Sequence, residues 1–287
     1  MRTSILASLA LALTATAVQA APRIWDQTWV VTTQPDVQVV AQDAHIRIHA
    51  GSPGQVKVHV EYELKHWGVV MGGGEPAVVF EHRGDQITIT LNDPRSIGVI
   101  GGIDERFVAD VTVPSPVHLA VRTKDGAIDC EPVSGQLQFE SGDGAIRARG
   151  LKGDLEVRSG DGRVTLDDVD GHLRARTRDG HLSASGRFDE LDLGAGDGRV
   201  DALVRPGSQP ESAWNVETGD GSVSVRIPHD INTLLDARTK DGHINVQLPI
   251  SLQGRLDRRE LIGELNNGGP SLRIRTGDGS ITLALSD

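Results

Sequence analysis

The residues with the clearest chemical signature in this sequence are aspartates that directly precede glycines at a regular spacing. Five Asp-Gly pairs stand 18 residues apart, and three more follow at steps of 23, 21 and 37 residues. Carboxylates are calcium ligands, and glycine-rich nonapeptide rolls bind calcium through aspartates. The fuller Gly-Gly-x-Gly-x-Asp pattern of such rolls is absent here, and each repeat has one turn aspartate.

A turn explains the Asp-Gly pair without a metal. Asp hydrogen-bonds to nearby backbone groups, and Gly accepts a positive φ. We therefore predict structural turn residues and leave calcium binding at the turns open. The predicted turn residues are Asp125, Gly126, Asp143, Gly144, Asp161, Gly162, Asp179, Gly180, Asp197, Gly198, Asp220, Gly221, Asp241, Gly242, Asp278 and Gly279.

Histidines are the second set of candidate ligands. His45 and His49 lie on one face of a predicted strand with Arg47, and His59 lies on the facing strand. Two or three histidines can bind a metal, but the outward alternation of polar residues explains these positions as well. The sequence therefore predicts no metal site at these histidines.

The remaining reactive residues form no catalytic pattern. His181 and His243 each follow an Asp-Gly turn but stand two or more repeats apart. Cys130, the only cysteine, falls in an apolar column, where a small buried hydrophobe is expected rather than a nucleophile. Neither Gly-x-Ser-x-Gly nor His-Glu-x-x-His occurs, and the glycine-rich segments lack the Lys-Ser/Thr of a phosphate loop. We predict no catalytic residue and no cofactor.

Strands must position the turns, because apolar residues alternate on both sides of each Asp-Gly pair. A period of two is typical of strands, so each repeat is strand, turn, strand, second turn. An antiparallel meander also fits this pattern, but the outward charges favour stacked coils, as where Asp129 and Arg147 take the same place in neighbouring repeats. The column three residues after the turn Asp is Ile128, Ile146, Val164, Leu182, Val200, Val223, Ile244 and Ile281.

The fold class predicted is all-β: a single-stranded β-solenoid (β-helix) of about 18-residue coils with Asp-Gly turns over residues 111–287. An irregular β N-terminal cap over residues 21–110 precedes it in the same domain, with strands near 44–50, 55–64, 78–82 and 86–91. Aromatic residues are 3% of the chain, so we expect aliphatic core columns with no room for rings. Glycine-rich apolar segments at 67–74 and 97–102 are interpreted as flexible loops, or as a contact surface.

The last predicted coil, at the C-terminal end of the repeats, needs a segment that caps its exposed edge. Residues 283–287 directly follow a strand, so either an earlier insert folds over the last coil or its edge pairs with another chain. We expect a homo-oligomer through this C-terminal edge in the second case. Two inserts interrupt the period, a Pro/Ser-rich loop at 205–213 and an extra coil or excursion at 250–268.

Composition and the N-terminus restrict the function. Residues 1–20 have Arg2, an apolar segment and a small-residue site, the pattern of a signal peptide cleaved after Ala20. No later segment is apolar enough for stable membrane insertion. The net charge of −11, which becomes more negative without Arg2, argues against nucleic acid as a partner. We expect an exported protein that is periplasmic, secreted or at the cell surface.

The motifs Val111-Thr112-Val113-Pro114, T-K-D-G-A-I and repeated T/S-G-D-G-x-V/I resemble the DUF4097 family of adhesin-like exported bacterial β-solenoid proteins. The resemblance covers residues 105–287 and extends into 30–104. It implies a non-enzymatic envelope protein that presents a repeat surface to a polymer or protein, and it carries over no catalytic residue. The alternative is a polysaccharide-active β-helix enzyme, which would need two carboxylates in one groove with nothing basic between them.

Overall fold

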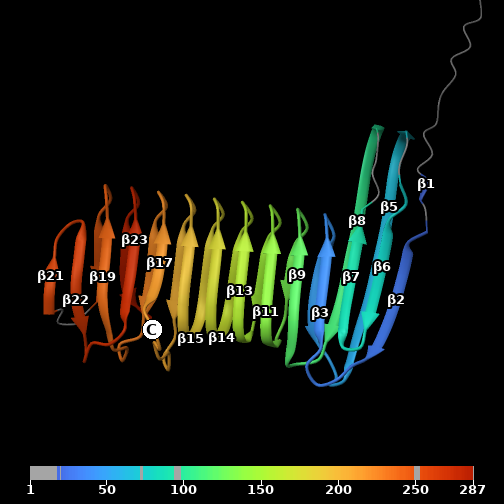
Figure 1. The fold of residues 1–287 in the computed structure, drawn as a ribbon. Helices are drawn as coiled ribbons and strands as arrows, with labels where there is room; N and C mark the ends of the chain where they lie inside the picture. Colours follow the sequence, from blue (N-terminus) through green and yellow to red (C-terminus); the bar gives the residue numbers. More distant parts are fainter. Residues whose placement is uncertain (1–17, 20, 72–73, 94–97, 249–252, 287) are drawn as a thin grey trace, which may run out of the picture.

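The computed structural model describes residues 18–19, 21–71, 74–93, 98–248 and 253–286, which form strands and no helix. The strands stand side by side in one long stack (Figure 1). The prediction of an all-β, solenoid-like fold is thus confirmed. Among the described residues no helix is long and apolar enough to cross a membrane. The predicted signal peptide lies outside the described residues except for Val18–Gln19.

The strands of the first half are β1 Val18–Gln19, β2 Arg23–Val30, β3 Asp36–Ala41, β4 His45–Ala50, β5 Gln55–Met71, β6 Ala77–Arg83, β7 Gln86–Asn92, β8 Gly98–Val113, β9 Val117–Thr123, β10 Ile128–Cys130, β11 Ser134–Ser141 and β12 Ile146–Arg149. Those of the second half are β13 Lys152–Ser159, β14 Val164–Thr177, β15 Leu182–Ala195, β16 Val200–Val204, β17 Trp214–Thr218, β18 Val223–Ile227, β19 Thr233–Thr239, β20 Ile244–Gln247, β21 Gln253–Leu256, β22 Glu260–Leu265, β23 Ser271–Thr276 and β24 Ile281–Leu285.

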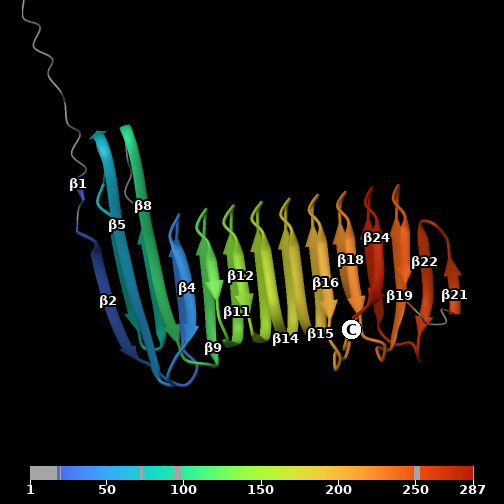
Figure 2. The ribbon, with the colours of Figure 1, turned by 180° about the vertical axis from the view of Figure 1, so that it is seen from behind.

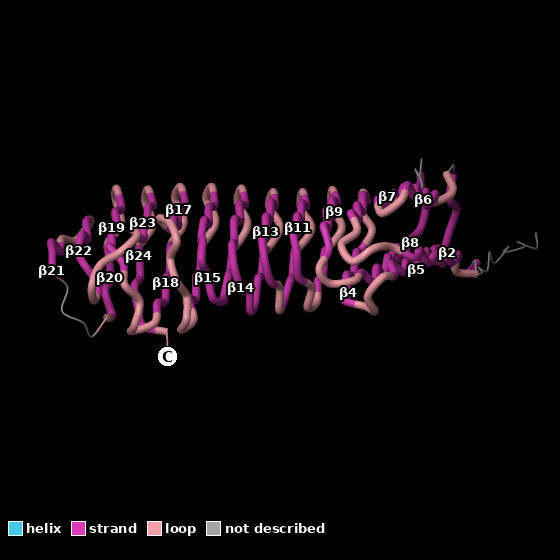
Figure 3. The backbone as a smooth tube through the Cα atoms, turned by 60° about the horizontal axis from the view of Figure 1, so that its bottom comes forward, coloured by secondary structure: helices cyan, strands magenta, loops and turns pink. Residues whose placement is uncertain are grey.

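The middle of the stack consists of coils that each give one strand to each of two facing layers (Figure 3). Pairing is parallel: Ile128 pairs with Ile146, and Ile146 with Val164, each 18 residues further along the chain. In the other layer Leu137 pairs with Leu155 at the same offset. The long β14 and β15 bend through a second turn and contribute to both layers. Equal offsets place equivalent residues in straight columns, as the outward charges predicted.

The core lies between the two layers and is largely aliphatic. It is one continuous cluster of inward residues that runs from Val31 to Leu283. The expectation of no room for rings is wrong, because Phe139, Phe188 and Trp214 are fully buried. Phe188 and Trp214 flank the insert at 205–213, where the coil is longer, and their rings meet edge to face at 6.5 Å between centroids.

At the C-terminal end the coils do not stack in chain order. β23 pairs in parallel with β17 on one side and β19 on the other, and β24 pairs likewise with β18 and β20. The coil of residues 271–285 therefore lies between those of 214–227 and 233–247. Because β24 is hydrogen-bonded on both sides, the open C-terminal edge expected in one of the two alternatives is wrong. A homo-oligomer stays a prediction that this edge does not support.

The cover of the last coil comes from the second insert. β22 pairs antiparallel with β19, and β21 pairs antiparallel with β22 (Figure 1). Residues 253–265 are therefore a hairpin across the end of the stack rather than an extra coil; residues 250–252 lie outside the described set. An antiparallel hairpin interrupts the parallel pattern, which limits further coil addition.

The N-terminal end is interleaved in the same way. β3 and β4 pair in parallel with β9 and β10 on one side and with β7 and β8 on the other. Regular coils therefore begin near residue 36, earlier than residue 111. The antiparallel strands β5 and β2 (Figure 2) and β6 (Figure 1) cover this end. Most of the two segments interpreted as loops belongs instead to β5 and β8, which pair from Lys57 with Thr112 to Met71 with Gly98.

Candidate functional site

The predicted turn residues gather in one column along an edge of the two layers. A Cβ added to Gly144 would stand 1.9 Å from the carbonyl oxygen of Gly126, and one on Gly198 would stand 1.9 Å from that of Gly180. None of the eight turn glycines has a positive φ, so close backbone approach rather than handedness requires glycine. The same contacts give the spatial order Gly126, Gly144, Gly162, Gly180, Gly198, Gly221, Gly279 and Gly242.

A buried threonine holds the turns together. The Gly126 N–H donates to Thr123 Oγ1 at 3.0 Å, and that hydroxyl donates to the Gln42 carbonyl at 2.8 Å. Thr177 and Thr239 make the same bond to the N–H of their own turn glycine. These residues satisfy backbone groups that the turn would leave unpaired.

The turn aspartates are exposed, and among the described residues four of the eight, Asp125, Asp161, Asp179 and Asp241, form an ion pair with a cation beside them. Lys124 lies 3.0 Å from Asp125, and Arg178 lies 2.9 Å from Asp161 and 3.7 Å from Asp179. These contacts offset repulsion between stacked carboxylates, although each exposed pair contributes little because both groups stay solvated. In the described part of the chain, no group of three His, Cys, Asp or Glu side chains is arranged to hold a metal ion.

Cys130 and the histidines singled out from the sequence do not meet in one site. Cys130 is buried, and this burial raises the pKa of its thiol to about 12. Each histidine has its own polar partner. The closest contacts are His45 with Asp129 at 2.6 Å, His49 with Glu131 at 3.6 Å, His59 with Asp26 at 2.7 Å, His181 with Asp201 at 3.0 Å and His243 with Ser280 at 3.1 Å.

A groove lies elsewhere, on the outer face of the layer that contains β3, β9, β11, β13, β14 and β15. Its volume is about 450 Å³. Two outward columns line it in register. The lining polar residues are Asp36, His118, Gln136, Asp154, His172 and Glu190 in one column, and Gln138, Glu156 and Arg174 in the other.

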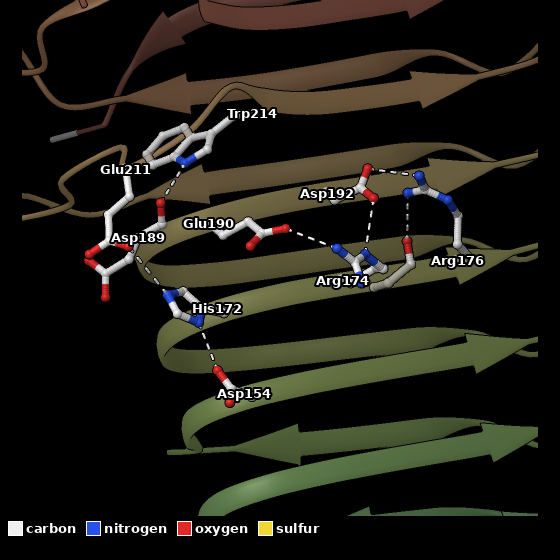
Figure 4. Close-up of polar contacts among 10 residues, drawn as sticks. Asp154, His172, Arg174, Arg176, Asp189, Glu190, Asp192, Glu211 and Trp214 are labelled. Carbon is white, nitrogen blue, oxygen red and sulfur yellow. Dashed lines mark hydrogen bonds and ion pairs between the residues drawn. The ribbon is translucent and has the colours of Figure 1, made fainter. Parts of the chain in front are cut away.

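One half of this groove is charged and internally paired (Figure 4). His172 Nδ1 lies 2.7 Å from Asp154 Oδ1, and Arg174 Nη2 donates to Glu190 at 3.0 Å. Arg174 also lies 3.4 Å from Asp192, further along the same face. The hydrogen bond to Asp154 is the main cause that raises the pKa of His172, and neighbouring carboxylates add to it. This half therefore presents neutralised ion pairs rather than free charge.

The other half carries imidazole and amide side chains without partners in the described part of the chain, with one carboxylate, Asp36, at its end. Within the described residues, no side-chain hydrogen bond or ion pair engages His118, Gln136 or Gln138. Ala120 lies beside them and pairs with Gln38 on one side and Gln138 on the other. Its small side chain leaves the groove hollow between two longer ones. Imidazole and amide groups here are free to donate and accept hydrogen bonds.

The first insert borders the charged half of the groove. Glu211 lies 3.9 Å from His172 Nε2, and the Glu211 N–H donates to the Asp189 carbonyl at 3.0 Å. Trp214 Nε1 donates to the same carbonyl at 3.2 Å (Figure 4). Arg205, at the start of the insert, makes an ion pair with Asp168. The Pro/Ser-rich segment is thus fixed at several points against neighbouring coils.

This groove was not predicted from the sequence. The column seven residues before each turn Asp reads His118, Gln136, Asp154, His172 and Glu190, so its polarity was visible in the repeat. The hollow over Ala120 and the absence of internal partners for the described amides could not be seen, because they depend on side-chain lengths across neighbouring coils.

Several solved structures are similar in fold at low identity. A candidate lipid binding protein from Parabacteroides distasonis is 12% identical, with 91% of this chain and 96% of that chain covered and a TM-score of 0.48. A candidate adhesin from Bacteroides fragilis is 9% identical, with coverage of 91% and 97% and a TM-score of 0.39. A candidate cell adhesion protein from Clostridium sporogenes is 13% identical, with coverage of 92% and 100% and a TM-score of 0.28. At these values the similarities carry no argument about function.

A family model matches most of the chain. No curated protein matches the chain. The Toastrack DUF4097 model matches residues 36–284, from the first residue of β3 into β24. This range takes in both interleaved ends of the stack as well as the regular coils, and it confirms the resemblance seen in the repeat motifs. The chain belongs to the Toastrack DUF4097 family.

Proposed function

We propose that this chain is a non-enzymatic, exported, adhesin-like protein of the bacterial cell envelope, and that the groove over β9, β11 and β13 binds an envelope polymer or protein. The observation that carries the proposal is the row of free polar groups, His118, Gln136 and Gln138, beside the hollow at Ala120. The repeating unit of this surface is the coil of about 18 residues closed by an Asp-Gly turn. Coils stacked about 4.8 Å apart offer an extended ligand equivalent contacts at successive positions.

The charges in the groove support binding rather than hydrolysis. A glycosidase needs two carboxyl groups on either side of the bond, about 5–10 Å apart, with one acting as acid. Here His172 stands between Asp154 and Glu190 in the same column, and Arg174 pairs with Glu190. Basic groups therefore stand between the carboxylates of the groove, whereas the enzyme alternative needs two carboxylates with nothing basic between them.

Export is the second part of the proposal and has its own test. The protein recovered from the envelope or the medium is expected to begin at Ala21. Its intact mass should equal that of residues 21–287. A recovered protein that retains residues 1–20 would contradict cleavage after Ala20, because a removed signal peptide is absent from the mature chain.

The binding test is a pull-down from envelope fractions with the purified protein. Ala120→Leu fills the hollow of the groove, and Ala284→Leu is the matched control because Ala284 faces outward on β24 in the other layer. Capture by the first variant should fall at least about tenfold, equivalent to a loss of about 1.4 kcal/mol, while the control keeps full capture. Equal capture by both variants would mean that the groove is not the binding surface.

A further inference from the structure

The half of the groove with free amide and imidazole groups restricts what kind of ligand can bind there, and the following inference rests on the proposed function. We infer that it binds a neutral glycan strand that runs along the axis of the stack, with successive sugars over successive coils. The first argument is spacing. His118, Gln136 and Asp154 occupy one register position on β9, β11 and β13, about 4.8 Å apart from strand to strand. That interval is close to the length of a sugar unit in an extended chain.

The second argument is hydrogen-bonding chemistry. A sugar hydroxyl both donates and accepts, and so does a side-chain amide or a neutral imidazole. Gln136 and Gln138 carry two such amides, and His118 adds the ring, with no competing bond inside the described part of the protein. Groups left free for hydroxyls at regular intervals suit a polyhydroxylated ligand, whose own hydrogen bonds to water must be replaced.

The third argument is charge. Four carboxylates, Asp36, Asp154, Glu156 and Glu190, line the groove against one guanidinium and two imidazoles. An anionic polymer such as a uronic-acid chain or a nucleic acid would meet repulsion, and the paired cations are not free to bind it. The free groups at the centre are two amides and one imidazole, and the carboxylate beside them, Asp36, accepts a hydrogen bond from Gln86 at 3.4 Å. A neutral ligand fits both halves.

The fourth argument excludes backbone recognition. An extended peptide binds a sheet mainly by adding a strand at a free edge. β9, β11 and β13 are each paired on both sides, so their backbone groups are already used. Side chains alone are available on this face, and they favour a ligand recognised through its own hydroxyls.

The test uses β-1,4-linked glucose and N-acetylglucosamine oligomers of two to six units, titrated calorimetrically into the purified protein. We expect affinity to rise with length and to change little with salt, since no net charge is matched. Gln136→Ala and Gln138→Ala should each weaken binding about fivefold, the value of one net hydrogen bond of about 1 kcal/mol. Gln247→Ala, an exposed glutamine on β20 of the other layer, is the control and should leave affinity unchanged.

Two results would overturn the inference and leave the proposed function standing. One is tight, salt-sensitive binding of oligogalacturonate or of a lysine-rich peptide that Ala120→Leu abolishes. The other is failure of every neutral oligomer while envelope capture still depends on the hollow at Ala120. If envelope capture also ignores Ala120→Leu, the proposed function fails along with the inference.

Discussion

The tight backbone contact between neighbouring turns makes Gly144→Ala the sharpest structural perturbation of this chain. The added methyl would stand 1.9 Å from the carbonyl oxygen of Gly126, and ordinary contact begins near 3.4 Å. Both sides of the contact are backbone, so neither can rotate away. The two turns must move apart by about 1.5 Å.

The magnitude follows from the bonds that this movement breaks. The Asp143 N–H donates to the Lys124 carbonyl at 3.0 Å, and a second backbone bond at 3.3 Å joins the same two turns. Each backbone group left unsatisfied costs about 1–3 kcal/mol. We expect Gly144→Ala to lower the free energy of unfolding by about 3–5 kcal/mol.

The matched control is Gly84→Ala in the hairpin between β6 and β7. Nothing lies within 4 Å of a Cβ at Gly84, but its φ is +62°. The control therefore measures the cost of the left-handed backbone alone, about 1–2 kcal/mol. The two variants separate steric contact between turns from intrinsic backbone preference.

Thermal unfolding followed by circular dichroism gives the comparison. For a chain of this size, 1 kcal/mol shifts the melting temperature by about 2–4 °C, so Gly144→Ala should melt at least about 6 °C lower than the natural protein. Hydrogen exchange at residues 124–126 and 142–144 should rise in this variant and not in Gly84→Ala. Equal losses in the two variants would refute the argument from close turn packing.

Three further predictions concern ionisable and reactive groups. Asp161→Ala removes one exposed ion pair with Arg178, so the melting temperature should fall by only about 1–3 °C and export should persist in a fractionation assay. His172→Gln should reduce stability at about pH 5 and match the natural protein at alkaline pH. The raised pKa of His172 gives stability that is present below the ordinary pKa of about 6.5 and is lost as the pH rises through the pKa of the folded state. A difference in melting temperature between the two proteins that stays the same at every pH would contradict this. Cys130, with its buried thiol and a pKa of about 12, should resist iodoacetamide at about pH 8 until denaturant is added; rapid labelling of the folded protein would contradict its burial.

The regular coils could be predicted because each one carries its own pattern. Ile128, Ile146, Val164, Leu182 and Val200 form one predicted column, and the structure pairs them in that order. Alternation of apolar residues sets which side of a strand faces the core, and equal repeat length sets the register. Local sequence therefore determines both features.

The order of coils at the two ends could not be predicted in this way. The coil at 271–285 has the same apolar column as its neighbours, with Ile281 in the place of Val223 and Ile244. A pattern shared by every coil cannot say which two will be adjacent. The choice depends on long-range contacts and on the hairpin of β21 and β22, whose antiparallel pairing lies outside the repeat.

The sequence predicts which outward positions of the candidate site are polar, but it does not predict which side chains pair with one another. The sequence predicts opposite outward charges on neighbouring coils, and Arg147 with Asp129 at 3.6 Å is such a pair. Arg158 instead contacts Glu156 at 2.6 Å on its own strand. Long flexible side chains can choose between partners at similar distance, so the column pattern does not fix their pairing.

The interleaved ends also bear on how this architecture can change its length. Between β11 and β16 each coil pairs only with the coil before and the coil after it in the chain, so deleting residues 144–161, one period from turn to turn, would join equivalent positions. At either end, deleting one coil would remove a strand whose two neighbours come from distant parts of the chain, and those neighbours would lose their pairing partner. Duplication and loss of repeats are thus tolerated in the interior and opposed at the ends. Relatives of different length should differ in the number of middle coils and keep both interleaved ends.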